Sequence, residues 1–172
     1  MKTLLIIGAG GHGKVVAEIA NACGYDKVAF LDDNSSEAIG KINDLERFKD
    51  HFEEAFVGIG NNATRKELIC KLEDIGYKIP VLIHPTAYIS KSAKISAGTA
   101  IEPHAVVNAN SIIGKGCIVS VGAIVDHNSV LQDYVHVNAG AIISAGANIK
   151  TYRKVEAGEV VPGYGINLSA EK

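Results

Sequence analysis

A glycine-rich segment near the start of the chain has the residue types that bind phosphate. Residues 8–13 read Gly-Ala-Gly-Gly-His-Gly and lie between an apolar stretch typical of a buried strand, residues 3–7, and a stretch typical of a helix. Glycines let the backbone approach a phosphate at the first turn of such a helix. Asp32 and Asp33 end a second predicted strand about 20 residues later, where a carboxylate can bind a ribose hydroxyl. The pattern predicts a nucleotide-binding unit.

The elements expected after this motif complete a small α/β unit. A short helix at residues 44–50, a strand at residues 55–59 and a helix that opens at Gly60-Asn61-Asn62 precede a last strand at residues 81–83. We expect a parallel sheet of about four strands, which is half of a dinucleotide-binding fold. One nucleotide therefore fits better than two, and an NAD-dependent oxidoreductase would lack room for the nicotinamide half. The alternative without a ligand is that the glycines only form a tight turn and the two acids cap a loop.

The second half of the chain carries a six-residue repeat. From Ile83 onward a branched aliphatic residue recurs at every sixth position through fourteen units that end at Val161. The position four residues later is small in most units up to Ala147, and Arg153 and Glu159 break this rule. A period of six fits a short strand followed by a turn, with three units in each coil and neighbouring coils about 4.8 Å apart. The repeat predicts a parallel β-helix, with the aliphatic residues inside and the small residues at the corners.

Composition limits the partners and the location of the protein. The formal net charge is −2, and no lysine or arginine run suggests a nucleic-acid partner, so small molecules or proteins are expected. The first apolar run stops at Gly8, and no stretch approaches the roughly 20 apolar residues of a membrane span. A cytoplasmic protein is therefore expected. Cys23, Cys70 and Cys117 are too few and scattered for a disulfide framework or a zinc cluster, so we expect reduced packing residues and no metal.

The glycine loop, the segment Phe30-Leu31-Asp32-Asp33, the segment Gly58-Ile59-Gly60-Asn61 and the repeat together resemble the NeuD/PglD family of sugar acyltransferases over nearly the whole chain. In that family an N-terminal unit holds a nucleotide-activated sugar, and a left-handed β-helix holds acetyl-CoA between adjacent subunits of a homotrimer. The resemblance implies a Rossmann-like nucleotide-sugar-binding domain at residues 1–80 and a left-handed β-helix acyltransferase domain at residues 81–172.

The resemblance also implies site residues. Nucleotide-sugar contacts fall on the glycine loop, the two acids and the loop after the third strand, with Arg65 as a further candidate: Gly10, Gly11, His12, Asp32, Asp33, Gly60, Asn61 and Arg65. Acetyl-CoA is expected near His136, Ala145 and Gly146. The general base is His127, within Asp126-His127-Asn128. An amine or hydroxyl must lose a proton as it attacks a thioester, and imidazole, with an ordinary pKa near 6.5, can accept that proton at neutral pH.

The sequence departs from the family pattern in three places. Many members have a carboxylate directly after the catalytic histidine, where this chain has Asn128, so either Asp126 or Asp133 takes that role or the base is weaker. Ser120 stands where relatives often have asparagine. The small-residue rule ends after Ala147, although relatives generally add another coil that helps to wall the CoA cleft.

These observations favour one function and leave others open. The leading hypothesis is transfer of an acetyl group from acetyl-CoA to the amine of a nucleotide-linked amino sugar, with UDP as the favoured nucleotide, in surface-glycan biosynthesis. Sugar O-acetylation needs the same base and is not separated from it. A gamma carbonic anhydrase would need three zinc-binding histidines with a pair five residues apart, whereas His127 and His136 are nine apart. A non-catalytic trimeric nucleotide-sugar-binding module is the remaining alternative.

Overall fold

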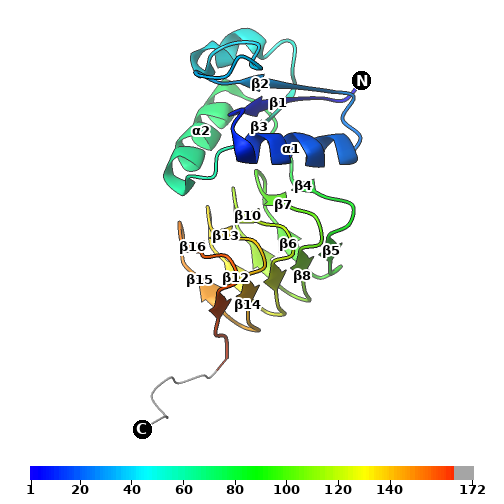
Figure 1. Cartoon of the computed structure of the whole chain (residues 1–172), viewed down its shortest axis with the longest axis vertical. Helices are drawn as coiled ribbons and strands as arrows, with labels where there is room; N and C mark the ends of the chain where they lie inside the picture. Colours follow the sequence, from blue (N-terminus) through cyan, green and yellow to red (C-terminus); the bar gives the residue numbers. More distant parts are fainter. Residues whose placement is uncertain (165–172) are drawn as a thin grey trace.

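The computed structural model describes residues 1–164, in which an α/β unit packs along one side of a parallel β-helix (Figure 1). The α/β unit has a three-stranded parallel sheet with the order β2-β1-β3. Its elements are β1 (Thr3–Ile7), α1 (Gly11–Ala22), β2 (Lys27–Leu31), the 3-10 helix η1 (Ile42–Phe48), β3 (Glu54–Val57) and α2 (Asn62–Ile75). None of the helices within residues 1–164 has the length and apolarity needed to cross a lipid bilayer.

The central strand β1 is buried on both faces because a helix covers each of them. Leu4 and Ile6 pack against the apolar side of α1, and Leu5 and Ile7 pack against α2 and η1. This division follows from the alternation of side chains along a strand. The continuous apolar run from Leu4 to Ile7 is the pattern expected for a parallel strand covered on both sides.

The predicted fourth strand of this sheet belongs to the β-helix instead. Residues 82–83 form β4 (Leu82–Ile83), which pairs with β7 (Ala100–Ile101). At the β3 edge only an isolated parallel bridge joins Glu54 and Lys78. The reason is local: Gly76 caps the C-terminal end of α2, and Pro80, which has no backbone N–H and cannot extend a ladder, turns the chain away after that bridge.

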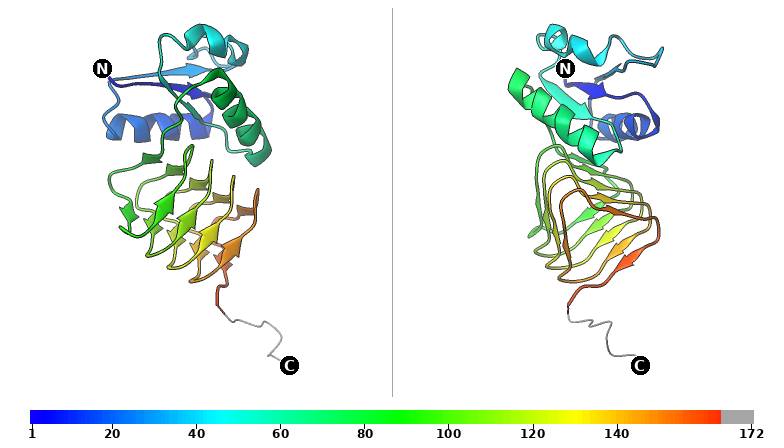
Figure 2. Two further views of the ribbon diagram at one scale, coloured as in Figure 1. Left: turned by 180° about the vertical axis from the view of Figure 1, so that it is seen from behind. Right: turned by 90° about the vertical axis from the view of Figure 1, so that its left-hand side faces the viewer.

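The β-helix predicted from the repeat is confirmed, with fourteen two-residue strands on three faces. Face I contains β4, β7, β10 (Ile118–Val119), β13 (His136–Val137) and β16 (Lys154–Val155). Face II contains β5 (Tyr88–Ile89), β8 (Val106–Val107), β11 (Ile124–Val125), β14 (Ile142–Ile143) and β17 (Val160–Val161). Face III contains β6 (Lys94–Ile95), β9 (Ile112–Ile113), β12 (Val130–Leu131) and β15 (Asn148–Ile149). Viewed toward one end, the coils outline a triangular prism (Figure 2).

The interior of the prism is filled as the repeat predicts. The second residue of each strand points inward, and from Ile101 to Val161 these side chains are at most 5% exposed. The hydroxyl groups at three small-residue corners each donate to a carbonyl of the next coil: Thr99 to Gly114 at 2.9 Å, Ser111 to Asp126 at 2.8 Å and Ser129 to Ser144 at 3.0 Å. These bonds explain why serine and threonine can replace alanine in a buried corner.

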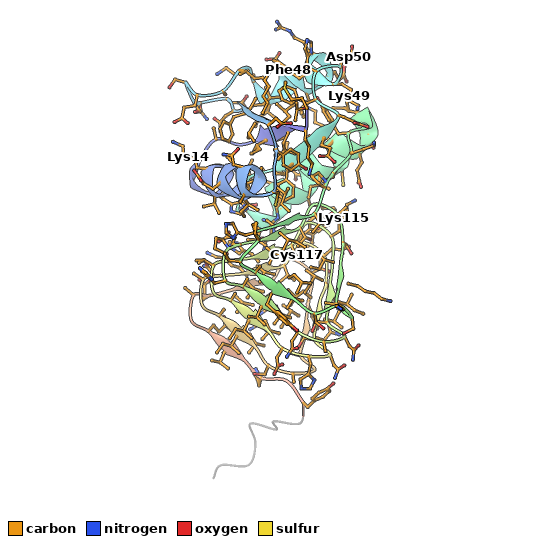
Figure 3. The ribbon with its side chains drawn as sticks, turned by 90° about the vertical axis from the view of Figure 1, so that its right-hand side faces the viewer. Lys14, Phe48, Lys49, Asp50, Lys115 and Cys117 are labelled. Carbon is orange, nitrogen blue, oxygen red and sulfur yellow. The ribbon has the colours of Figure 1, made fainter. Side chains whose placement is uncertain are left out.

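Each cysteine is free in the described structure, as predicted. Cys117 lies inside the prism near its junction with the α/β unit, where Lys115 reaches Glu73 of α2 at 2.5 Å (Figure 3). Its thiol lies 3.2 Å from the carbonyl oxygen of Gln132. Cys117 therefore acts as one more small, hydrogen-bonded corner residue.

The end of the repeat is held by the two residues that break the small-residue rule. Arg153 and Glu159 form an ion pair, with 2.7 Å between Nη2 and Oε1. The other oxygen of Glu159 accepts a bond from the Glu156 amide at 2.8 Å. From the sequence, residues 163–168 would cover the exposed edge of the last strand, and they lie mostly outside the described residues.

The two units meet where the helices rest on face I and on an adjacent corner of the prism. The outward-facing Leu82 and Ala100 of face I are buried in the same cluster as Val16 and Ile19 of α1. On the other side, Ile69 of α2 packs against the corner glycines of the first coils. The end of the α/β unit that carries the glycine loop is thereby placed beside the outer surface of face I.

Candidate functional site

The glycine loop joins β1 to α1 and contains two kinds of glycine. Gly8 has a φ of +100°, and a Cβ on Gly13 would lie 2.0 Å from the Gly8 carbonyl oxygen, so both positions are closed to larger residues. A Cβ on Gly10 or Gly11 would meet nothing within 4 Å. Within residues 1–164 no side chain caps α1 at Gly10. The first-turn N–H groups of α1 can therefore bind an anion that approaches over the two open glycines.

The two acids after β2 have different roles. The Asp32 carboxylate accepts three backbone N–H bonds, from Ala9 at 2.8 Å, Asn34 at 2.8 Å and Ser35 at 3.0 Å, and the first two of these do most to lower its pKa. Asp32 thus ties the glycine loop to the end of β2. Asp33 is exposed and accepts one backbone bond, from Ile42 at 3.1 Å. Asp33 retains more acceptor capacity for a ribose hydroxyl.

The loop after β3 forms one wall of a pocket against the β-helix. Asn61 caps α2, with its Oδ1 accepting from the Thr64 amide at 3.0 Å, and a Cβ on Gly60 would meet nothing within 4 Å. The pocket has a volume of about 510 Å³. It is lined by Gly60, Asn61, Asn62, Ala63, His136, Tyr152 and Lys154. The predicted residues Gly60, Asn61 and His136 therefore share one cavity.

The expectation that Arg65 contacts a nucleotide needs correction, because this side chain is fully buried between the two units. It donates to the carbonyl oxygens of Gly116 at 2.7 Å and Tyr134 at 3.2 Å, both in the β-helix. Its other acceptors lie in the loop before α2 and its first residue: Ile59, Gly60 and Asn62. Burial lowers the pKa of Arg65 to about 10, so it stays charged at neutral pH. Arg65 fastens the α/β unit to the prism.

The structure brings together His12, which was predicted to contact the nucleotide sugar, and His136, which was predicted to lie near acetyl-CoA, although one lies in each unit. Their ring centroids are 6.5 Å apart, and Ser120 Oγ lies 3.2 Å from His136 Nε2. Burial is the main cause that lowers the pKa of each imidazole to about 4, so both are neutral at pH 7. His12 Nε2 and His136 Nδ1 are buried and have no hydrogen-bond partner among the described residues. Unpartnered buried nitrogens of this kind are suited to receive a ligand.

Sequence reasoning missed Glu102, which completes this group. Its Oε1 lies 3.6 Å from His12 Nδ1, and its side chain is 9% exposed. No sequence signal identifies it, because it looks like any polar residue that follows an inward-facing aliphatic residue, here Ile101. Its contact with α1 depends on how the two units stack.

His127 lies on the exposed corner between β11 and β12. Its Nδ1 is 3.0 Å from the side-chain amide of Asn128. The Asp126 carboxylate accepts the backbone N–H of His127 at 2.7 Å and the amide of Asn108 at 3.0 Å, so it fixes the corner rather than the ring. Asp133 accepts the backbone N–H of Lys115 instead. Of the three sequence candidates, Asn128 is the one that contacts the imidazole.

The predicted Ala145 and Gly146 lie beside His127 on the next coil. The Gly146 amide donates to the His127 carbonyl at 3.0 Å, and the Tyr164 amide donates to the Ala145 carbonyl at 2.9 Å. The Tyr164 ring lies 6.4 Å from the His127 ring, centroid to centroid. Tyr164 was not predicted and has no motif that would mark it.

Within one chain, His127 and the His12–His136 group lie on different sides of the prism. The corner that carries His127 joins faces II and III, whereas His136 is on face I. In a triangular prism the corner between two faces points away from the third, as the end view shows (Figure 2). A site that uses both must therefore take them from two copies of the chain.

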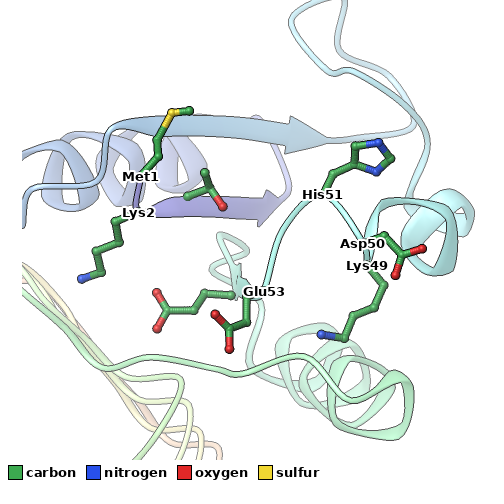
Figure 4. Close-up of a pocket in the computed structure, with 8 residues that line it drawn as sticks. Met1, Lys2, Lys49, Asp50, His51 and Glu53 are labelled. Atoms are coloured by element: carbon green, nitrogen blue, oxygen red, sulfur yellow. The ribbon is translucent and has the colours of Figure 1, made fainter.

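The described residues also line two further pockets. One pocket, of about 650 Å³, is near the N-terminal ends of β1 and β3 (Figure 4). The glycine loop lies at the other end of these strands. This pocket mixes both signs of charge, with Lys2, Lys49, Asp50 and Glu53 among its residues. The other, of about 270 Å³, lies between α1 and the prism and includes Glu102. Residues 1–164 contain no group of three or more His, Cys, Asp or Glu side chains arranged to hold a metal ion.

Known proteins share both halves of this architecture. Residues 3–72 match the family model described as the PglD N-terminal domain. The chain is 38% identical to the acetyltransferase domain of PglB from Neisseria gonorrhoeae FA1090, with a TM-score of 0.91, and the match covers 95% of this chain and 83% of that one. The chain belongs to the PglD/NeuD-type family. The predicted family and fold class, an α/β unit followed by a left-handed parallel β-helix, are both confirmed.

Of two other similar proteins, one has a nucleotide-linked sugar in its name and the other was solved with such a sugar bound. UDP-N-acetylbacillosamine N-acetyltransferase from Bacillus subtilis (strain 168) is 35% identical over 112 residues, which is 59% of this chain and 51% of that protein. The match thus spans about half the length of that relative. PerB from Caulobacter crescentus, solved in complex with CoA and GDP-perosamine, is 31% identical with a TM-score of 0.80 and coverages of 95% and 90%. The PglB domain has also been solved in complex with acetyl coenzyme A.

Proposed function

We propose that this protein transfers an acetyl group from acetyl-CoA to the amine of a nucleotide-linked amino sugar. The observation that carries the proposal is its 38% identity, over 94% of the chain, to a PglB domain that binds acetyl coenzyme A. The sugar substrate is supported by the name of the Bacillus relative and by the GDP-perosamine bound to PerB. UDP is the favoured nucleotide because it is part of the name of the Bacillus relative. With a sugar of this kind as substrate, the protein would act in surface-glycan biosynthesis.

The glycine loop is proposed to hold the nucleotide. Gly10 and Gly11 leave the N-terminus of α1 open to a diphosphate, since a Cβ at either position would meet nothing within 4 Å. Asp33 is the acid with acceptor capacity for a ribose hydroxyl. The sugar would then extend toward His12, Gly60 and Asn61, with His136 on the opposite wall.

His127 is proposed to be the general base. Asn128 Nδ2 faces His127 Nδ1 in the structure. Rotating this amide by 180° places Oδ1 there instead, where it accepts the proton of Nδ1 and leaves the lone pair on Nε2. Nε2 can then take a proton from the attacking amine as the new C–N bond forms at the thioester carbonyl and the C–S bond breaks. The proton passes to the departing CoA sulfur, so the base is regenerated. Ala145 and Gly146 beside His127 are proposed to contact the acetyl-CoA.

A homotrimer is proposed to assemble this site. The outward-facing residues of face II are all apolar, and Tyr88, Ile124, Ile142 and Val160 are 36–60% exposed. A continuous apolar face of this kind is typical of an interface between proteins. A cyclic arrangement that covers face II can bring the His127 corner of one copy to the His12 and His136 of its neighbour. This supplies the second copy that the geometry of one chain requires.

The catalytic proposal is tested by thiol release from acetyl-CoA with a panel of UDP- and GDP-linked amino sugars and their hydroxyl analogues. Wild-type protein is expected to release thiol with at least one amino sugar, and His127→Ala to reduce the rate by about 10²- to 10⁴-fold. His51→Ala, an exposed histidine on the far side of the α/β unit, is the matched control and should keep the wild-type rate. Absence of thiol release by wild-type protein that still binds nucleotide would favour the non-catalytic module instead.

The shared site is tested by co-expressing His127→Ala and His12→Ala chains with different tags and purifying over both. Every trimer recovered this way contains both chains, so cyclic symmetry gives one site in three with His127 from one copy and His12 from the other. At a nucleotide-sugar concentration well below the wild-type KM, about one third of the wild-type rate is therefore expected, while each variant alone gives a much lower rate. Recovery of no activity, or an active wild-type monomer by mass in solution, would contradict the shared site.

A further inference from the structure

Glu102 is a buried carboxylate with no cationic side chain beside it. No lysine or arginine nitrogen within residues 1–164 lies within 4.0 Å of it. Its Oε2 accepts the Val121 amide at 2.9 Å, which leaves Oε1 directed toward His12. Burial raises the pKa of Glu102, and the amide bond offsets this only in part. Burying an acid in this way is costly, so its place between the two units needs a reason.

The surroundings of Glu102 place it beside the proposed acceptor site. It lines the 270 Å³ pocket between α1 and the prism, whose other residues are Val15, Glu18, Ile19, His84, Pro103 and Val121. His12, which it faces, lies next to His136, and His136 lines the 510 Å³ pocket. Glu102 therefore lines the smaller of these two pockets and His136 lines the larger one, and His12 lies between the two residues.

The chemistry of the two side chains fixes the form of His12. A neutral imidazole carries a proton on one nitrogen and a lone pair on the other, whereas an ionised carboxylate can only accept. The His12 nitrogen that faces Glu102 is Nδ1, at 3.6 Å from Oε1, so the favourable arrangement has the proton there. Nε2 then carries the lone pair, and it is buried without a partner among the described residues.

We propose that Glu102 is a positioning residue that holds the proton of His12 on Nδ1, so that Nε2 accepts a hydrogen bond from a hydroxyl or amine of the acceptor sugar. This inference rests on the proposed function. It assigns His12 to the sugar rather than to the diphosphate, because phosphate oxygens cannot donate to a lone pair. Glu102 acts through His12 and does not touch the reacting atoms.

The kinetic test is Glu102→Gln, which keeps the shape of the side chain. Its Oε1 can still accept the Val121 amide, but its NH₂ group now faces His12 Nδ1 and drives the proton to Nε2, where it opposes a donor on the sugar. The KM for the nucleotide sugar is expected to rise about 5- to 30-fold, the effect of one buried hydrogen bond, while the KM for acetyl-CoA stays within about twofold. Glu18→Gln, an exposed acid on the rim of the same pocket, is the control and should change neither value.

A double-mutant cycle separates action through His12 from a direct or purely structural role. In a His12→Ala background, Glu102→Gln is expected to cause no further rise in KM. An undiminished effect in that background would overturn the proposal, because Glu102 would then act on its own.

A spectroscopic readout keeps the inference testable apart from activity. Nitrogen-15 NMR of the histidine rings, with the His12 signals assigned by their loss in His12→Ala, should show protonated Nδ1 in the wild-type protein and protonated Nε2 in Glu102→Gln. The same tautomer in both proteins would overturn the inference even if the enzyme is active. The expected change of tautomer in a protein that releases no thiol would instead reject the proposed function alone.

Discussion

Replacing Arg65 with methionine is expected to destabilise the protein by about 3 kcal/mol, because it removes the donor that joins the two units. The carbonyl oxygens of Gly116 and Tyr134 lose bonds of 2.7 and 3.2 Å in buried surroundings. Each unsatisfied buried acceptor costs about 1–3 kcal/mol, which gives about 2–6 kcal/mol for the pair. The variant avoids the burial of a guanidinium charge, so the net loss should fall in the lower half of that range.

Urea and thermal unfolding, followed by circular dichroism, measure this loss. For a chain of this size about 3 kcal/mol corresponds to a fall in Tm of roughly 6–12 °C. Arg47→Met, the same substitution at an exposed arginine in η1, is the control and should stay within about 0.5 kcal/mol of wild type. If the free energy of unfolding of Arg65→Met lies within about 1 kcal/mol of wild type, the two carbonyls have other donors and the fastening role is wrong.

Three further predictions concern the site. Asn128→Asp places an anion beside the imidazole of His127, the proposed base, at a contact of 3.0 Å, and about 1 kcal/mol of attraction near the surface should move the acid limb of the pH–rate profile up by about 0.7 pH unit. The pKa values of His12 and His136 are lowered to about 4, so between about pH 6.5 and 4 these residues bind protons only when unfolded. Stability in urea should therefore fall as the pH falls through that range, by up to about 1.4 kcal/mol per pH unit for each, and substituting both with asparagine should flatten the slope. Gly13→Ala should lower the Tm, because its Cβ would lie 2.0 Å from a backbone oxygen, whereas Gly10→Ala should fold normally and weaken nucleotide binding measured by calorimetry.

The β-helix could be predicted in detail because each residue class has one place in a coil. An aliphatic residue such as Ile101 or Val125 has to point inward, and a small residue has to fill the corner. Register follows directly, since residues 118 and 136 are paired, one full coil apart. It was harder to predict that residues 82–83 would join the β-helix and not the α/β sheet, because the apolar residues 81–83 suit either one. Only the geometry around Pro80 decides between them.

The contacts between the two units could not be predicted, because they join residues that lie far apart in the chain. Arg65 is 51 residues from Gly116 and 69 from Tyr134, and no spacing rule relates them. One signal was available: Arg65 shares a helical face with Ile69 and Leu72, at i+4 and i+7, and both are buried. An arginine on the buried face of a helix indicates a structural role more often than an exposed ligand contact.

The two histidines that the sequence assigned to chemistry and to binding differ in a way that the structure explains. His127 is exposed on its corner and has a neutral amide as its partner, so within residues 1–164 its side chain is open to water. His12 is buried and has a carboxylate beside it. A neighbouring copy that covers the His127 corner would remove water from the base and add the acceptor site at the same time. In the proposed trimer, burial of the proposed base and completion of the site would be one event, so covering the apolar face II would affect activity as well as assembly.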